Sequence, residues 1–241
     1  SIVVPAYNAG AFLAVSLDRL LEYLSSKPWH WELVVVSDGS TDRTAEIVSE
    51  YSARHPRVML IEAAHGGKGA AIRRGMLEAR GEWRFMCDAD LSMPPEHLDR
   101  FFAGDGGRPK FDVSIASREA RGARRIGEPL KRHIYGRLFN YFVQIVALRG
   151  IKDTQCGFKL YSAKAVETVF PHQRLMGFGF DVEVLFLARK AGLSIGEVAI
   201  DWTYHGPSTM TLRKGALGFM DVARIRMNHL TGRYRAVRRP G

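Results

Sequence analysis

The stretch Glu32-Leu-Val-Val-Val-Ser37 is apolar at almost every position, and Asp38-Gly-Ser-Thr-Asp42 turns the chain directly after it. A strand with one face in water alternates apolar and polar residues, whereas a run that is apolar throughout predicts a strand buried on both faces. Such strands are typical of parallel sheets that helices cover. The stretch therefore indicates an α/β fold.

Strand and helix signals alternate on both sides of this stretch. Strands are predicted at Ser1–Pro5, Val58–Glu62 and Trp83–Cys87, with helical patterns between them. This alternation predicts a mostly parallel, Rossmann-like sheet flanked by helices. The second half is less regular, with strands expected at 113–116, 157–161 and 195–202 and helices at 130–149, 181–191 and 216–230.

The composition is that of an ordinary globular protein. Of the 241 residues, 46% are hydrophobic and 25% charged, which suits one folded domain. No run approaches the roughly 18–20 apolar residues that cross a bilayer. The two cysteines, Cys87 and Cys156, make no disulfide framework, so we expect a reduced, cytoplasmic setting.

The net charge of +10 is unevenly distributed. Residues 1–104 hold 11 Lys/Arg against 14 Asp/Glu, and residues 105–241 hold the other 24 basic and 11 acidic groups. A basic half beside an acidic half indicates an anionic partner for the basic one. Charge alone leaves nucleic acid, a membrane surface, a phosphorylated substrate and a merely solvated basic face open.

Polar clusters follow the predicted strands of the first half. They are Pro5-Ala-Tyr-Asn8, Asp38, Gly66-Gly-Lys-Gly69 and the pair Asp88 and Asp90. Ligands of open α/β sheets bind beyond the carboxyl ends of the strands, so we expect these clusters to converge on one edge.

Asp88 and Asp90 are the sharpest of these signals. Two carboxylates one residue apart at the end of a hydrophobic strand suit Mg²⁺ or Mn²⁺, which favour oxygen ligands and a substrate's phosphates. The alternative is a solvated acidic pair in a loop.

Gly66-Gly-Lys-Gly69 lacks the Gly-x4-Gly-Lys-Ser/Thr spacing of a P-loop. Small residues at a helix start still let backbone N–H groups approach a phosphate, and Lys68 adds a positive charge. A purely structural turn is the alternative.

Together these segments resemble the family 2 glycosyltransferases of the GT-A fold. The matching pieces are Val3-Val-Pro-Ala-Tyr-Asn8, Val36-Ser-Asp-Gly-Ser-Thr-Asp42, Gly67-Lys-Gly69 and Cys87-Asp-Ala-Asp-Leu91. The resemblance implies that Asp88 and Asp90 hold the metal and that residues of these segments bind a nucleotide-sugar donor: Pro5, Tyr7, Asn8, Asp38, Gly39, Lys68, Gly69, Asp88 and Ala89. The chain departs from the family pattern at Ala9 and Ser37, where acidic residues are usual.

The second half resembles the branch that glycosylates polyprenyl phosphates. Ala116-Ser-Arg118, Leu130-Lys-Arg132, Asp153-Thr-Gln-Cys-Gly-Phe-Lys159 and Phe180-Asp-Val-Glu183 carry this resemblance, and the third is closest to dolichyl-phosphate β-glucosyltransferases. By resemblance, Arg118 and Arg132 act in catalysis by gripping the acceptor phosphate, with Gln155 and Lys159 beside them. Ser92 replaces a glutamine metal ligand of the related mannose synthases.

Asp181 and Glu183 stand two residues apart at a predicted helix start. A sugar-hydroxyl acceptor would want a carboxylate base here, whereas a phosphate acceptor, with its second pKa near ~6, is already ionised at pH 7. Acidic residues also favour a helix N-terminus, so a structural or arginine-orienting role is the alternative.

These patterns predict one GT-A domain over residues 1–241, with a nucleotide-sugar half at 1–104, an acceptor half at 105–214 and a basic amphipathic segment at 215–241. We expect peripheral association with the cytoplasmic face of a membrane, with Phe139, Phe142, Phe219 and Met220 dipping toward the acyl chains.

The expected reaction is inverting transfer of a hexose, glucose from UDP-glucose, onto a polyprenyl or dolichyl phosphate. Three alternatives stay open: GDP-mannose as donor, a sugar hydroxyl as acceptor, and a non-catalytic nucleic-acid-binding module. The last lacks an aromatic RNA-binding signature or a helix-turn-helix, so we expect no nucleic acid.

Overall fold

The computed structural model describes residues 1–127, 129–203 and 212–238. Its first half alternates β1 (Ile2–Ala6), α1 (Leu13–Ser25), β2 (Leu33–Asp38), α2 (Thr44–Arg54), β3 (Val58–Ala63), α3 (Lys68–Glu78) and β4 (Trp83–Met86). Two 3-10 helices, η1 (Pro95–Phe102) and η2 (Asp105–Gly107), lead to β5 (Val113–Ser117) and β6 (Arg124–Ile126). The alternation predicted for the first half is confirmed.

The second half contains α4 (Leu130–Val146), β7 (Lys159–Ser162), α5 (Ala163–Val169), η3 (Phe170–His172), α6 (Phe180–Lys190), β8 (Ile195–Ala199), β9 (Asp201–Thr203) and α7 (Leu212–Leu230). The strand predicted over 195–202 is divided at Ile200, so that β8 joins the main sheet and β9 pairs with β6. The segments β6 and α5 lay within stretches that the sequence analysis left without regular structure.

The described strands form a seven-stranded sheet in the order β3-β2-β1-β4-β7-β5-β8. β7 runs antiparallel to both β4 and β5, while the other neighbours are parallel. The prediction of a mostly parallel sheet is therefore confirmed, with one reversed strand in its middle. Because β1, β2 and β4 point the same way, the loops that follow them meet at one edge.

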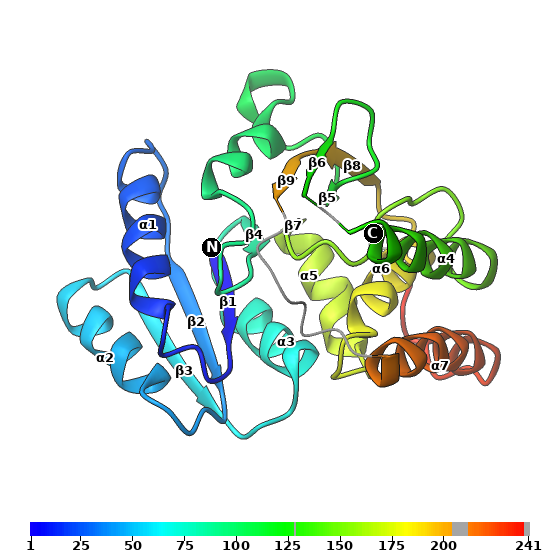
Figure 1. Ribbon diagram of the computed structural model, residues 1–241, viewed down its shortest axis with the longest axis horizontal. Coiled ribbons are helices and arrows are strands. Elements are labelled where there is room, and N and C mark those ends of the chain that lie inside the picture. The colour runs from blue at the N-terminus through cyan, green and yellow to red at the C-terminus, as the bar shows by residue number, and fades with distance from the viewer. Residues whose placement is uncertain (128, 204–211, 239–241) are drawn as a thin grey trace.

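Helices cover the sheet on both faces (Figure 1). In β2, Val34 and Val36 pack with α3 on one face, whereas Leu33 and Val35 pack with α1 and α2 on the other. All four side chains are fully buried. This is the packing that a continuously apolar strand predicts, since each residue needs an apolar partner whichever way it points.

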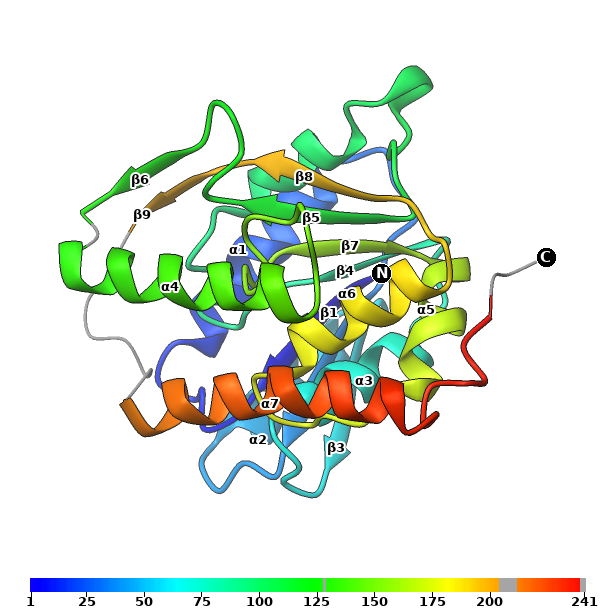
Figure 2. The ribbon, with the colours of Figure 1, turned by 90° about the vertical axis from the view of Figure 1, so that its right-hand side faces the viewer.

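Helices α4 and α7 run across the same side of the molecule (Figure 2). Phe219 of α7 packs between Phe139 and Phe142 of α4, with ring centroids 5.2 and 5.0 Å apart. The two α4 rings therefore face α7, and the expectation that they dip into a membrane is wrong for them. No helix in the described ranges is both long enough and apolar enough to cross a bilayer.

Candidate active site

The turn after β4 carries the two predicted metal carboxylates. Its backbone closes through a bond from the Leu91 N–H to the Asp88 carbonyl (3.1 Å), and Leu91 takes a left-handed φ of 45°. The Asp90 Oδ1 accepts bonds from the Ser92 N–H (2.9 Å) and hydroxyl (2.6 Å). Burial of the Leu91 side chain in the core offsets the cost of its backbone conformation. Asp90 is exposed, and Asp88 is half-buried beside it.

Asp88 is held from two sides. The Lys68 Nζ lies 2.5 Å from Asp88 Oδ1. On the other side stands the backbone of Gly157, where an added Cβ would come within 2.0 Å of Asp88 Oδ2. A larger residue at position 157 would push the Asp88 carboxylate aside, so glycine lets that carboxylate pack against the segment that precedes β7.

The oxygen set fits a hard divalent cation. Mg²⁺ commonly binds through one or two carboxylates and completes its shell with waters and substrate phosphates. Asp88 and Asp90 supply that number, and Asp90 is open to solvent. Among the residues that the structure describes, no group of three or more His, Cys, Asp or Glu could hold a metal. Asp88 and Asp90 thus suit a cation whose remaining ligands come from a bound diphosphate, and not a structural metal site whose ligands all come from the protein.

The loops after β1 and β2 are tied together at the same edge. Asn8 takes a φ of 48°, and its Oδ1 accepts a bond from the Thr41 N–H (2.8 Å). Gly39 has a φ of 66°, and an added Cβ would lie 2.6 Å from the His65 nitrogen. Pro5 is half-buried within β1 and pairs with Val36 of β2.

Asp38 is buried and bonded to the loop before α3. Its carboxylate accepts bonds from the N–H groups of Gly66 (2.8 Å) and Gly67 (2.9 Å). Tyr7, which is 52% exposed, stacks on the His65 ring at 4.4 Å between centroids. The sequence analysis did not single out His65, although it directly precedes Gly66.

The start of α3 differs from a phosphate cradle. The Gly69 N–H donates to the Met176 carbonyl (2.7 Å), and the Ala70 N–H approaches the same oxygen (3.3 Å). A Cβ on Gly69 would lie 2.8 Å from that carbonyl. These amides are therefore used inside the protein, and the positive charge that α3 offers at the site is the Lys68 ammonium. Ala89, the middle residue of the Asp-x-Asp, is buried.

Arg118 follows β5 and forms a two-point pair with Asp153. Its Nε lies 2.7 Å from Asp153 Oδ2 and its Nη2 lies 2.9 Å from Oδ1, while its backbone N–H also donates to Oδ2 (3.0 Å). The guanidinium stands over the Trp202 ring, 5.3 Å from the centroid. Burial tends to raise the pKa of the Asp153 carboxyl, but Arg118 outweighs it and the pKa is lowered. Asp153 thus keeps its charge and orients Arg118.

The segment Asp153–Gly157 connects the two predicted subsites. Asp153 at its start binds Arg118, and Gly157 at its end touches Asp88. Four peptide links reach at most about 14 Å, which limits the separation of the two contacts along this segment. Gln155, in the middle, is half-buried. The side chain of Arg132 lies outside what the structure describes.

Lys159 is fully buried. Its Nζ donates to the Cys156 carbonyl (2.6 Å) and forms an ion pair with Asp181. Burial raises the pKa of the Asp181 carboxyl, and the ammonium groups of Lys159 and Lys68 oppose that rise. The structure therefore brings Lys159 together with Asp181 inside the protein, where no surface of Lys159 meets solvent.

Glu183 is also buried and makes three bonds. Its Oε2 accepts from the N–H groups of Arg174 (2.9 Å) and Leu175 (2.7 Å), and its Oε1 accepts from the Tyr234 hydroxyl (2.5 Å). Glu183 thereby joins the chain after α7 to the segment whose Met176 carbonyl anchors α3. Burial raises the pKa of the Glu183 carboxyl, against the effect of these donors.

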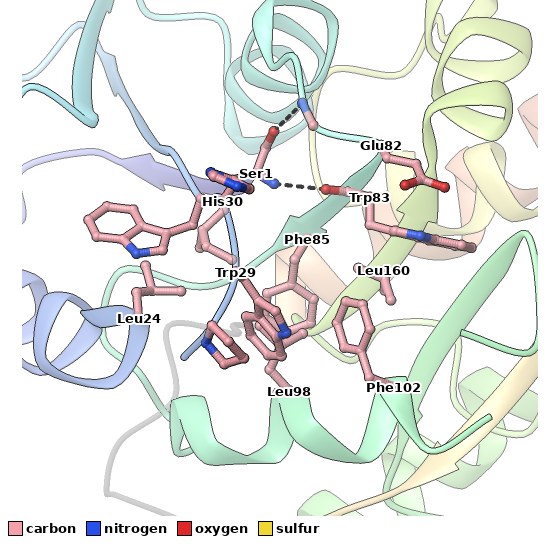
Figure 3. Close-up of a pocket in the computed structure, with 14 residues that line it drawn as sticks. Ser1, Leu24, Trp29, His30, Glu82, Trp83, Phe85, Leu98, Phe102 and Leu160 are labelled. Carbon is pink, nitrogen blue, oxygen red and sulfur yellow. Dashed lines mark hydrogen bonds between the residues drawn. The ribbon is translucent and has the colours of Figure 1, made fainter. Parts of the chain in front are cut away.

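A separate pocket of about 340 Å³ lies at the opposite ends of the strands (Figure 3). Trp29, Trp83, Phe85 and Phe102 line it, with Ser1 at its rim. None of the predicted site residues lines this pocket.

The fold and the side chains at the carboxyl ends of β1, β2 and β4 together define a nucleotide-sugar transferase of the GT-A type. The profile described as Glycosyl transferase family 2 matches residues 1–170, and the chain belongs to that family. The resemblance stated from the motifs is confirmed.

Curated relatives support the same branch. A dolichyl-phosphate beta-glucosyltransferase of Trichomonas vaginalis is 36% identical, over 88% of this chain and 66% of its own length. The Dictyostelium discoideum enzyme of that name is 33% identical, over 96% and 75%, and the Homo sapiens enzyme is 30% identical, over 98% and 77%.

Solved structures share the fold. A mannosyl-3-phosphoglycerate synthase from Rubrobacter xylanophilus superposes with a TM-score of 0.67 at 20% identity, covering 96% of this chain and 74% of that one. A glucosyl-3-phosphoglycerate synthase from Mycobacterium tuberculosis, solved with Mn²⁺, UDP-glucose and phosphoglyceric acid, gives 0.63 at 15% identity, covering 100% and 80%. The GT-A prediction is confirmed.

Proposed function

We propose that this glycosyltransferase moves glucose from UDP-glucose onto a polyprenyl phosphate with inversion at the anomeric carbon. The observation that carries the proposal is the segment Asp153–Gly157, which orients Arg118 at one end and packs on Asp88 at the other. Relatives named dolichyl-phosphate beta-glucosyltransferase, at 30–36% identity, support the same substrates. The roles of the individual residues and of the ranges 1–104, 105–214 and 215–241 are part of the proposal.

On the acceptor side, Arg118 orients the phosphate and neutralises part of its charge. A guanidinium presents several N–H donors in one plane and suits phosphate recognition. The phosphate monoester is mostly a dianion at pH 7, so positioning matters more than a strong base. Arg132 is proposed as the second arginine and Gln155 as a neutral contact. Lys159, being buried, would act by fixing the segment from within.

The two acidic residues of α6 support a phosphate acceptor over a sugar hydroxyl. A hydroxyl acceptor needs a carboxylate within reach of its proton. Asp181 is buried against Lys159, and Glu183 is bonded to two backbone N–H groups and Tyr234. Both carboxylates have structural partners that a general base would have to give up.

On the donor side, Asp88 and Asp90 would hold Mg²⁺ or Mn²⁺, and Lys68 would meet the diphosphate. When bound, the cation supplies positive charge to the departing nucleoside diphosphate. Tyr7 offers an exposed ring to the base, with Asn8, Asp38 and Gly39 shaping the loops around it. The Mycobacterium tuberculosis structure with Mn²⁺ and UDP-glucose supports this pairing of metal and donor. GDP-mannose is the alternative donor.

A membrane surface is the proposed location, with α4 lying on it. The helix exposes a stripe of large apolar side chains that comprises Leu130, Ile134, Tyr135, Leu138, Tyr141 and Ile145. Exposed basic residues stand before α4 in the chain at Arg121 and Arg124 and after it at Arg149. Such a face suits the boundary of an anionic bilayer. The cytoplasmic leaflet is proposed because the acceptor's phosphate must meet a soluble nucleotide sugar.

A grid of donors and acceptors tests the reaction. Purified full chain with Mn²⁺ is given UDP-glucose or GDP-mannose, together with a short polyprenyl phosphate or the matching polyprenol. We expect a glucosyl phosphodiester only from UDP-glucose and the phosphate. Mannose transfer would select the other donor, whereas transfer to the polyprenol, or to no lipid at all, contradicts the acceptor.

Vesicle flotation tests the location. The chain should float with vesicles that contain anionic lipid, and Leu138→Ser should reduce the floating fraction at least several-fold without changing thermal stability, because Leu138 is exposed. Equal flotation of both proteins would refute the role of α4.

A further inference from the structure

Lys68 stands at the first position of α3, with its ammonium 2.5 Å from Asp88 Oδ1. Neither side chain is free in solvent, since 22% of Lys68 and 29% of Asp88 is exposed. Asp88 is the acidic residue in direct contact with the Lys68 ammonium, and the carboxylates of Asp181 and Asp90 act on it at longer range.

These acidic groups are not equivalent partners. Asp181 has the buried ammonium of Lys159, and Asp90 accepts bonds from Ser92. The Lys68 ammonium is thus the positive charge in direct contact with Asp88, at Oδ1. A divalent cation bound at this turn would need the Asp88 carboxylate as well.

The backbone of Lys68 is fixed while its side chain can swing. Gly67, before it, has a φ of 94°, and a Cβ there would lie 2.8 Å from the Met176 carbonyl. Gly69, after it, donates its N–H to the same carbonyl. The four-carbon stem of a lysine carries its ammonium on rotatable bonds. The ammonium can therefore leave Asp88 without any change in α3.

We propose that Lys68 is an internal counter-ion that competes with the divalent cation for Asp88 and gives the carboxylate up when the donor's diphosphate arrives. This inference rests on the proposed function, because it presumes a cation and a nucleoside diphosphate at this edge. Its consequence is that cation and nucleotide bind with positive coupling, and that Lys68 is the residue responsible for much of it.

Distances and charge support the competition. Mg²⁺ binds a carboxylate oxygen at about 2.0–2.1 Å, so a cation held by Asp88 Oδ1 would compete for space with the Lys68 Nζ, which lies 2.5 Å from that oxygen. Two cations so close repel one another strongly, so the ammonium has to move. A diphosphate gives it new anionic partners. Coupling between two ligands is commonly about 5- to 150-fold and is reciprocal.

Binding of Mn²⁺ to the full chain tests this without any turnover. Electron paramagnetic resonance counts free Mn²⁺ in titrations with and without UDP, for the wild type, Lys68→Met and Arg74→Met. Arg74 is the matched control, because it removes the same charge from α3 but from an exposed pair with Glu78. Thermal unfolding of each variant checks the fold.

In the wild type, UDP should tighten Mn²⁺ binding by more than tenfold. In Lys68→Met, Mn²⁺ without UDP should bind at least fivefold more tightly than in the wild type, and the added effect of UDP should shrink by a similar factor. Arg74→Met should match the wild type within about twofold, as expected when screened surface charges act at a distance.

Each of the other outcomes contradicts either the counter-ion inference or the proposed function. If Mn²⁺ binds with UDP but Lys68→Met keeps the wild-type affinity without UDP, the counter-ion inference is wrong and the proposed function stands. If Arg74→Met changes affinity as much as Lys68→Met, the effect is general electrostatics and the inference is again wrong. If the wild type binds no Mn²⁺ even with UDP, the metal role in the proposed function falls together with the inference.

Discussion

Replacing Asp181 by asparagine should destabilise the protein strongly, because the change leaves the Lys159 ammonium buried without its counter-charge. No part of the Lys159 side chain is exposed, and 4% of Asp181 is. The Lys159 ammonium also donates to the Cys156 carbonyl, 2.6 Å away, which carries no net charge. Breaking a buried pair by removing one member costs about 3–5 kcal/mol. For a chain of this length that lowers Tm by about 6–20 °C.

Thermal unfolding followed by circular dichroism measures this loss. Asp201→Asn is the matched control, since Asp201 pairs with Arg100 at 2.7 Å on the surface, where loss of a solvated pair should leave Tm nearly unchanged. A Lys159→Met, Asp181→Leu double variant should recover much of the loss, because it removes both charges together.

Asp181→Asn also separates the structural role of Asp181 from a role as general base. If the role is structural, activity per folded molecule should fall modestly, in step with the loss of stability. A general base predicts the reverse, with normal Tm and nearly complete loss of turnover. Unchanged Tm in Asp181→Asn would refute the reasoning about the buried pair.

The remaining predictions concern the turn, its neighbour and the C-terminal contact. Asp90→Asn should nearly abolish transfer at saturating Mn²⁺ while Tm stays near the wild-type value, because an amide lacks the carboxylate's charge; retained turnover would remove Asp90 from the metal site. Gly157→Ala should impair donor binding, since its Cβ would collide with Asp88; calorimetry with UDP and Mn²⁺ measures it, and normal affinity would contradict it. Tyr234→Phe should cost about 1–3 kcal/mol by leaving Glu183 short of a donor, and an unchanged denaturation midpoint would count against that bond.

Local signals in the sequence were sufficient to predict the fold class. The apolar run of β2 predicted burial on both faces, and the carboxylates that follow β4 marked the edge where ligands bind. Each of these signals spans only a few neighbouring residues, so the periodicity of a strand or the composition of a turn is enough to detect it. The division of 195–202 into β8 and β9 escaped because nothing in that stretch marks where one sheet ends and another begins.

The partners of the charged side chains were a different matter. Arg118 binds Asp153, 35 residues away, and Glu183 binds Tyr234, 51 residues away. Spacing along the chain carries no information about such pairs, because the fold alone brings them into contact. The acceptor contact expected of Lys159 and the phosphate contact expected of the amides at Gly66–Gly69 depended on the directions in which these groups point, and the sequence does not encode those directions.

The sequence by itself therefore determined the alternation of strands and helices in the first half, the family and the residue types gathered at the carboxyl ends of the strands. Only the tertiary structure decided which lysine reaches Asp88 and which one is buried. Lys68 and Lys159 are alike in charge and length, yet α3 presents one at the site and β7 turns the other inward. The physical reason is that an ammonium takes the nearest carboxylate in space, and nearness in space is a property of the packed sheet and helices.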